Sequence, residues 1–157
     1  MAQPVYIAVI GGSDIGPETT ALAREVGREV AARGAVLLCG GLGGVMAAAA
    51  QGAQEAGGAS LGILPDGDRR RANPYLTYTI ATNLGHARNV LLAHSADALI
   101  AVGGSYGTVS EAAIALKLGK PVIALNVTWD LQGLQRAATP KEAVDLAWKG
   151  SSRIPDA

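Results

Sequence analysis

The chain has 157 residues, of which 49% are hydrophobic and 17% charged, so its composition is typical of a folded domain and excludes an intrinsically disordered chain. Thirteen basic residues balance thirteen acidic ones, which argues against nucleic acid or an anionic membrane as a partner. The single cysteine, Cys39, excludes an internal disulfide and a cysteine-rich metal site. No segment resembles a signal peptide or a membrane-spanning helix, and we therefore expect a cytoplasmic protein.

Short apolar runs alternate with amphipathic segments along the chain. The runs predict buried strands, and segments whose apolar residues recur every three or four positions predict helices. In chain order we expect a strand at 5–10, a helix from Pro17 that Gly34 ends, a strand at 35–39, a helix at 45–55, a strand at 60–64, a loop at 66–75, a strand at 76–81, a helix at 86–94, a strand at 96–102, a helix from Thr108 that stops at Gly119, a strand at 121–125 and a capped helix at 140–148. Residues 129–138 have no clear pattern, and residues 151–157 are expected to form a frayed tail.

This alternation of strands and helices predicts the fold class. A strand that returns to the same sheet through a helix runs parallel to its predecessor. We therefore expect an α/β, Rossmann-like three-layer fold, with a parallel sheet covered by helices on both faces, as a single nucleotide-binding domain over residues 1–157. Ligands of such sheets bind beyond the carboxyl ends of the strands, where the strand order switches.

Three glycine clusters follow three of the expected strands: Gly11-Gly12-Ser13, Gly40 to Gly44, and Gly103 to Gly107. One cluster alone fits a tight turn. Three clusters at one sheet edge favour a ligand that approaches the bare backbone, because the free N–H groups and the helix dipole at such a turn attract phosphate. The dinucleotide fingerprint is missing, since Met46 stands in place of its third glycine and no acidic residue ends the second strand. A P-loop is also absent.

Several polar residues near these clusters allow two interpretations. Thr108 and Glu111 have the spacing of a helix capping box, but Glu111 is also the first carboxylate beside the third glycine cluster. Arg88 is either a solvated charge or a group that binds an anion near a helix start, where arginine is otherwise unfavourable. We expect His86 and His94 to be polar helix residues and predict no metal site. The arginines at 69–71 form either a solvated loop or a segment that closes over phosphate.

The third cluster also carries a family resemblance. Gly103-Gly104-Ser105-Tyr106-Gly107-Thr108-Val109-Ser110-Glu111 resembles the GGxGTxxE signature of the Lonely Guy (LOG) superfamily. That superfamily contains cytokinin-activating nucleoside-monophosphate phosphoribohydrolases, once misnamed lysine decarboxylases, and molybdenum-cofactor carrier proteins. Gly40-Gly41-Leu42-Gly43-Gly44-Val45-Met46 is similar to its earlier glycine-rich loop, and His86-Ala87-Arg88-Asn89 stands where the hydrolases have a His-x-Arg-Lys segment. The resemblance covers roughly residues 5–125.

The resemblance implies a set of site residues. Arg88 and Glu111 would be the catalytic pair if the protein is an enzyme, with Arg88 on the phosphate or sugar and Glu111 as the carboxylate that stabilises an oxocarbenium-like state. The residues that would bind the ligand and its phosphate are Gly11, Gly12, Ser13, Gly41, Gly43, Gly44, Met46, Arg88, Asn89, Gly103, Gly104, Ser105, Gly107 and Thr108. No cofactor would be required, and the ligand would be an AMP-like nucleotide or a molybdopterin-type molecule. The family also implies a homodimer or a larger homo-oligomer.

Three departures from the hydrolases separate two functions. Val102 stands where the hydrolases carry a proline, Asn89 where they carry a lysine, and Ala87 where they carry a polar or acidic residue. These residues and the short chain resemble the carrier-like branch more closely. We therefore expect a carrier or sensor that binds a phosphorylated, nucleotide-like ligand without turnover. The alternative is a nucleoside 5′-monophosphate phosphoribohydrolase that releases the base and ribose 5-phosphate.

Overall fold

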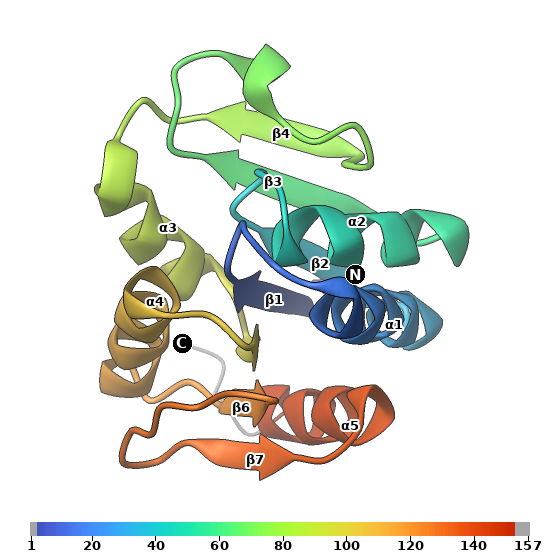
Figure 1. Cartoon of the computed structure of the whole chain (residues 1–157), viewed down its shortest axis with the longest axis vertical. Helices are drawn as coiled ribbons and strands as arrows, with labels where there is room; N and C mark the ends of the chain where they lie inside the picture. The colour runs from blue at the N-terminus through green and yellow to red at the C-terminus, as the bar shows by residue number, and fades with distance from the viewer. Residues whose placement is uncertain (1–2, 153–157) are drawn as a thin grey trace.

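The computed structural model describes residues 3–152 and contains one seven-stranded sheet, in the order β4-β3-β2-β1-β5-β6-β7. Every pair of neighbouring strands is parallel. The α/β, Rossmann-like fold class expected from the sequence is confirmed (Figure 1). In chain order the elements are β1 (Tyr6–Gly11), α1 (Pro17–Ala32), β2 (Val36–Cys39), α2 (Val45–Glu55), β3 (Ser60–Leu64), η1 (Arg69–Arg71), β4 (Tyr78–Ala81), η2 (Gly85–Ala87), α3 (Arg88–Ser95), β5 (Ala98–Val102), α4 (Tyr106–Lys117), β6 (Val122–Leu125), β7 (Gln135–Ala137) and α5 (Pro140–Ser151).

The helices cover the two faces of the sheet unequally. Helices α1, α2 and α5 lie on one side, and α3 and α4 lie on the other (Figure 1). Side chains of one strand alternate between these layers, so that Ile7 and Val9 pack with the first group of helices while Ala8 and Ile10 pack with the second. Cys39 is fully buried in the larger layer, as expected for a core thiol, and burial raises its pKa to about 11.

Most predicted elements are confirmed, and the differences have local causes. The helix expected from Thr108 begins two residues earlier, at Tyr106, and Ser105 is its N-cap. The patternless stretch 129–138 contains β7, and the loop at 66–75 contains η1. The predicted tail is wrong at its start, since Ser151 is the last residue of α5; residues 153–157 lie outside the described residues.

The predicted cap of the last helix is present. Thr139 is its N-cap, and its Oγ1 accepts a hydrogen bond from the Glu142 backbone N–H at 3.2 Å. Glu142 reaches back and accepts from the Ala138 backbone N–H at 2.8 Å. This arrangement satisfies two backbone N–H groups at the start of the helix, which have no partner within it.

The strand order fixes where a ligand can approach. The chain moves from the central β1 outward through β2, β3 and β4, and then returns to the other side of β1 as β5. The loops that leave β1 and β5 therefore diverge to opposite sides of the sheet, while the ends of both strands lie side by side, with Gly11 paired to Val102. A crevice at such a switch point is the usual binding place in this fold. None of the helices within residues 3–152 is both long and apolar enough to cross a membrane.

Candidate functional site

A pocket of about 440 Å³ lies at the carboxyl ends of β1, β2 and β5, at the switch in strand order. It brings together residues from all three glycine-rich regions and from the start of α3. Its lining residues are Gly11, Gly12, Ser13, Asp14, Leu42, Met46, His86, Arg88, Asn89, Ser105, Gly107, Thr108 and Glu111. Residues from distant parts of the sequence thus surround one volume at the predicted edge of the sheet.

The predicted site residues divide into two groups. Those that line the pocket are Gly11, Gly12, Ser13, Met46, Arg88, Asn89, Ser105, Gly107, Thr108 and Glu111. Gly41, Gly43, Gly44, Gly103 and Gly104 do not line it. Asp14, Leu42 and His86 line the pocket although sequence reasoning did not select them. Their proximity to the selected residues in the chain was the one available signal, because Asp14 follows the first glycine cluster, Leu42 lies within the second and His86 lies two residues before Arg88.

Two of the glycines outside the lining shape the loops that border the pocket. Gly104 has φ of +88°, and a Cβ there would lie 2.2 Å from Thr108 Oγ1. Gly44 has φ of +64°, and a Cβ there would lie 2.2 Å from the Gly12 carbonyl oxygen. Only glycine fits both the backbone conformation and the space at these positions. These two residues therefore support the pocket through loop geometry.

Arg88 is the first residue of α3, and its side chain is buried against the end of β2. The residue is only 8% exposed, so the interpretation as a solvated surface charge is wrong. A Cβ on Gly40 would lie 1.9 Å from Arg88 Nη1, which shows how closely the guanidinium packs on the backbone there. Within residues 3–152, Arg88 Nε is the one buried side-chain nitrogen or oxygen without a hydrogen-bond partner. Such an atom indicates a missing acceptor, since buried polar groups are almost always paired.

Burial dominates the electrostatics of Arg88. It lowers the pKa of the guanidinium, while Glu111, Cys39 and Asp66 act in the opposite direction. The group remains a cation at neutral pH because arginine titrates far above that range. The pocket thus holds a fixed positive charge away from bulk water, where its attraction for an anion is stronger than at the surface.

Glu111 lines the same pocket from α4 and is 8% exposed. The capping-box interpretation of Thr108 and Glu111 is wrong, because the N-cap of α4 is Ser105 and Thr108 is already the third residue of the helix. Burial raises the pKa of Glu111 to about 7, and the charge of Arg88 partly opposes this shift. Near neutral pH, Glu111 therefore exists both as a carboxylic acid that can donate a hydrogen bond and as a carboxylate that can accept one.

Hydrogen bonds connect the loops around the pocket. Asn89 Nδ2 on α3 donates to Ser110 Oγ on α4 at 3.4 Å, and Ser110 Oγ donates to the Gly107 carbonyl oxygen at 2.7 Å. From the loop after β6, Trp129 Nε1 donates to the Gly103 carbonyl oxygen at 3.3 Å. The two helix starts and the glycine turn after β5 are thereby held together.

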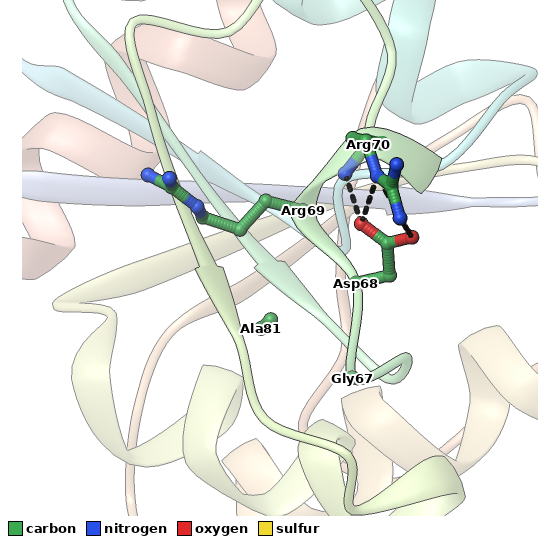
Figure 2. A pocket seen from close by; sticks show the side chains of 5 residues that line it. All are labelled: Gly67, Asp68, Arg69, Arg70 and Ala81. Carbon is green, nitrogen blue, oxygen red and sulfur yellow. Dashed lines mark hydrogen bonds and ion pairs between the residues drawn. The ribbon is translucent and has the colours of Figure 1, made fainter.

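A second, larger pocket of about 630 Å³ lies over the ends of β3 and β4, beside the arginine segment. Figure 2 shows Arg70 bonded to Asp68 while the Arg69 side chain extends away from that pair. This pocket contains none of the glycine clusters, and the side chains of Arg69 and Arg70 are exposed. We place the candidate site in the smaller pocket because it holds the buried cation and the buried carboxyl group. None of the arginines at 69–71 lines it, so the structure does not place them over the glycine loops.

No cluster of three or more histidine, cysteine, aspartate or glutamate side chains suited to a metal ion occurs among the described residues. The site therefore offers backbone N–H groups, one buried guanidinium and one buried carboxyl group. These groups suit a phosphorylated ligand, because the guanidinium presents several N–H donors to phosphate oxygens and glycine turns let the backbone approach closely.

The parallel sheet, its switch point and the GGxGTxxE segment at the end of β5 define a LOG-like protein of the Rossmann type. Comparison with known proteins gives the family: the chain belongs to the SLOG cluster4 family, whose model matches residues 4–149. The LOG-like superfamily and the carrier-like branch predicted from the sequence are both confirmed.

Relatives support the same assignment. An uncharacterized protein of Archaeoglobus fulgidus is 49% identical over 147 residues, which cover 94% of this chain and 97% of the relative. The molybdenum cofactor binding protein of the phototrophic bacterium Rippkaea orientalis is 34% identical with a TM-score of 0.89, covering 95% of this chain and 98% of that one. The molybdenum cofactor carrier protein of Chlamydomonas reinhardtii is 34% identical with a TM-score of 0.86, covering 96% and 100% respectively.

Proposed function

We propose that the protein is a carrier that binds a phosphorylated, nucleotide-like ligand of the molybdopterin type in the pocket at the strand ends. The observation that carries this proposal is the buried Arg88 guanidinium in the wall of this pocket, whose Nε has no hydrogen-bond partner. Similarity to two proteins described as binding or carrying the molybdenum cofactor supports the same class of ligand. The cofactor would be the cargo of the site, with its phosphate beside Arg88 and the glycine turns.

Incubation of the protein with molybdenum cofactor released from a donor enzyme tests this proposal. After incubation and gel filtration, molybdenum and pterin should elute together with the protein, as measured by mass spectrometry and pterin fluorescence. Arg88→Ala should lose the bound cofactor, and Arg69→Ala should retain it because Arg69 lies outside the pocket. Equal retention by the wild type and Arg88→Ala would contradict the proposed site, and no retention by the wild type would contradict the carrier function.

One observation favours a second function, nucleoside 5′-monophosphate phosphoribohydrolase. Glu111 lies in the same pocket as Arg88, and its pKa of about 7 suits a group that exchanges protons near neutral pH. In such a reaction, the carboxylate would stabilise the oxocarbenium-like state at the ribose or activate the attacking water, while Arg88 would bind the 5′-phosphate.

Incubation with AMP separates the two functions. An enzyme would release adenine and ribose 5-phosphate, and Glu111→Gln would abolish the release while the protein still binds AMP. A carrier would bind without forming product. Turnover in the wild type that Glu111→Gln removes would therefore replace the carrier proposal, whereas turnover that survives this change would exclude Glu111 as the catalytic group.

Assembly as a homodimer or larger homo-oligomer also remains a proposal. Helix α3 and the residue that follows α4 expose apolar side chains, with Val90 and Leu91 each 41% and Leu118 38% exposed. Burial of these side chains between copies would be favourable. Light scattering coupled to gel filtration gives the mass in solution, and a monomer at micromolar concentration would contradict this proposal.

A further inference from the structure

Another pocket, of about 360 Å³, opens between the first turns of α1 and α2, and we call it the α1–α2 pocket. Ser13 and Asp14 line both this pocket and the site at the strand ends. The two pockets therefore meet at the loop that follows β1. A single elongated ligand can occupy both by crossing these two residues, which are exposed.

We propose that the α1–α2 pocket binds the planar heterocycle of the ligand whose phosphate lies beside Arg88. This inference rests on the proposed binding function and adds the position and chemistry of the second half of the ligand. A fused heterocycle such as a purine or a pterin has flat faces that stack and edges that carry hydrogen-bond donors and acceptors.

The walls of the α1–α2 pocket offer both surfaces on which a flat ring can stack and a polar group that can bind its edge. Gly44, Ala47 and Ala48 contribute the α2 side, where their small side chains leave the helix surface open to a flat ring. Tyr75 contributes an aromatic ring, and Gln51 contributes an amide that both donates and accepts hydrogen bonds. Ligand pockets usually combine apolar walls with a few polar groups and have volumes of roughly 300–1,000 Å³, and the α1–α2 pocket has both properties.

Tyr75 is held in place by the glycine loop that borders the site. The Asn73 backbone N–H donates to the Gly41 carbonyl oxygen, and Asn73 Nδ2 donates to the Leu42 carbonyl oxygen, both at 2.9 Å. Asn73 Oδ1 in turn accepts from the Tyr75 backbone N–H at 3.1 Å. Leu42 lines the phosphate side of the site, so one set of hydrogen bonds fixes Tyr75 relative to both pockets.

The pocket ends where the two helices come into contact. Farther along the helices, a Cβ on Gly52 would lie 1.9 Å from the Arg24 carbonyl oxygen, and one on Gly27 would lie 2.0 Å from the Ala49 carbonyl oxygen. The backbones therefore touch beyond the pocket, and only their first turns leave space. This contact closes the inner end of the pocket, and Ser13 and Asp14 connect the pocket to the phosphate site.

Isothermal titration calorimetry with three probes tests the inference. Ribose 5-phosphate reaches only the phosphate site, whereas AMP and neopterin monophosphate carry a purine or a pterin in addition. We expect Tyr75→Ala to weaken the binding of AMP and of neopterin monophosphate, the two probes that carry a heterocycle, about tenfold, since stacking on an aromatic side chain is lost. Binding of ribose 5-phosphate should not change. Tyr75→Phe keeps the ring and should bind as the wild type does, and so should Tyr78→Ala, which removes an exposed tyrosine outside both pockets.

A second variant guards against loss of folding in Tyr75→Ala. Ala47→Leu fills the α1–α2 pocket from a partly exposed position and should weaken the ring-bearing probes in the same selective way. The inference is overturned if both variants bind AMP and neopterin monophosphate as tightly as the wild type, or if ribose 5-phosphate weakens equally. In those cases the proposed phosphate site would still stand, provided that Arg88→Ala loses binding. Failure of the wild type to bind any of the three probes would overturn the proposed function as well.

Discussion

Arg88 occupies the space that a side chain at Gly40 would need: a Cβ on Gly40 would lie 1.9 Å from Arg88 Nη1 and 2.8 Å from Arg88 Cζ. The end of β2 and the start of α3 therefore pack together through Gly40 and the Arg88 guanidinium. The position of the buried cation depends on the absence of a side chain on the neighbouring strand end.

The first prediction follows from this contact. Gly40→Ala should displace the Arg88 guanidinium and weaken the binding of ribose 5-phosphate about tenfold, which corresponds to the loss of roughly one charge-assisted hydrogen bond. The fold should be retained because the groups that must move, the Arg88 guanidinium and the Met46 Sδ that would lie 2.7 Å from the same Cβ, are the ends of flexible side chains. Calorimetry measures the affinity, and Gly43→Ala is the matched control, since nothing lies within 4 Å of a Cβ there. Equal affinities of the two variants would contradict the role of Arg88.

The second prediction concerns pH and Glu111. Its pKa is about 7 in the folded protein, against an ordinary value of 4.5, so the folded state keeps a proton that the unfolded chain has lost. The free energy of unfolding should therefore fall by roughly 3 kcal/mol as the pH rises from 4.5 to 7, and remain lower above that range. Urea unfolding at several pH values measures this change. Glu111→Gln cannot ionise and should lack most of it; an unchanged pH dependence in that variant would assign the effect to another group.

The third prediction separates stability from binding at Arg88. Replacing the arginine with methionine removes a buried cation with an unpaired nitrogen, so Arg88→Met should be more stable than the wild type by about 1–2 kcal/mol in the absence of ligand. The same variant should not bind ribose 5-phosphate. Thermal unfolding with and without the probe measures both effects. Arg69→Met should change neither quantity, because Arg69 is exposed and lies outside the pocket. A marked destabilisation of Arg88→Met would show that Arg88 is primarily a structural residue.

The fourth prediction distinguishes glycines that shape the turn from glycines that leave room for a ligand. Gly104→Ala should destabilise the fold by about 1–3 kcal/mol, since its φ of +88° and its contact with Thr108 both exclude a side chain. Gly107→Ala should be as stable as the wild type or more stable by up to about 1 kcal/mol, because nothing lies within 4 Å of a Cβ there and alanine favours the helix. Gly107 lines the pocket, so a methyl group there should take up ligand space, and Gly107→Ala should bind ligand more weakly than the wild type despite its stable fold. Undiminished binding by Gly107→Ala would favour a purely structural turn.

Local pattern was sufficient to predict most of the fold. Strand β3 and helix α2 have the predicted bounds, because apolar runs with glycine at their ends leave little freedom in their assignment. Strand β7 was not predicted: its residues Gln135, Arg136 and Ala137 lack a buried face, and they form a strand through their pairing with β6 at the sheet edge. Such pairing depends on tertiary structure and leaves no periodicity in the sequence.

The site was predicted in outline but not in the roles of individual glycines. Parallel topology places all three clusters at one edge, and the pocket at that edge follows from it. The sequence does not distinguish Gly104, which supports the turn, from Gly107, which lines the pocket, because that distinction depends on dihedral angles and on contacts with other loops. The burial of Arg88 could not be predicted from its neighbours in the sequence, because the guanidinium packs against Gly40, which lies far from Arg88 along the chain.

The hydrogen bond from Trp129 to the Gly103 carbonyl oxygen places an indole ring against the glycine turn that borders the candidate site. The chain contains two tryptophans, and the other, Trp148, lies beside Arg33 in the helical layer on the opposite face of the sheet. In a Trp148→Phe background, indole fluorescence arises from Trp129 alone, one hydrogen bond from the glycine turn. We expect the emission of this single fluorophore to change when a ligand fills the pocket, which would follow binding in real time without a label on either the protein or the ligand.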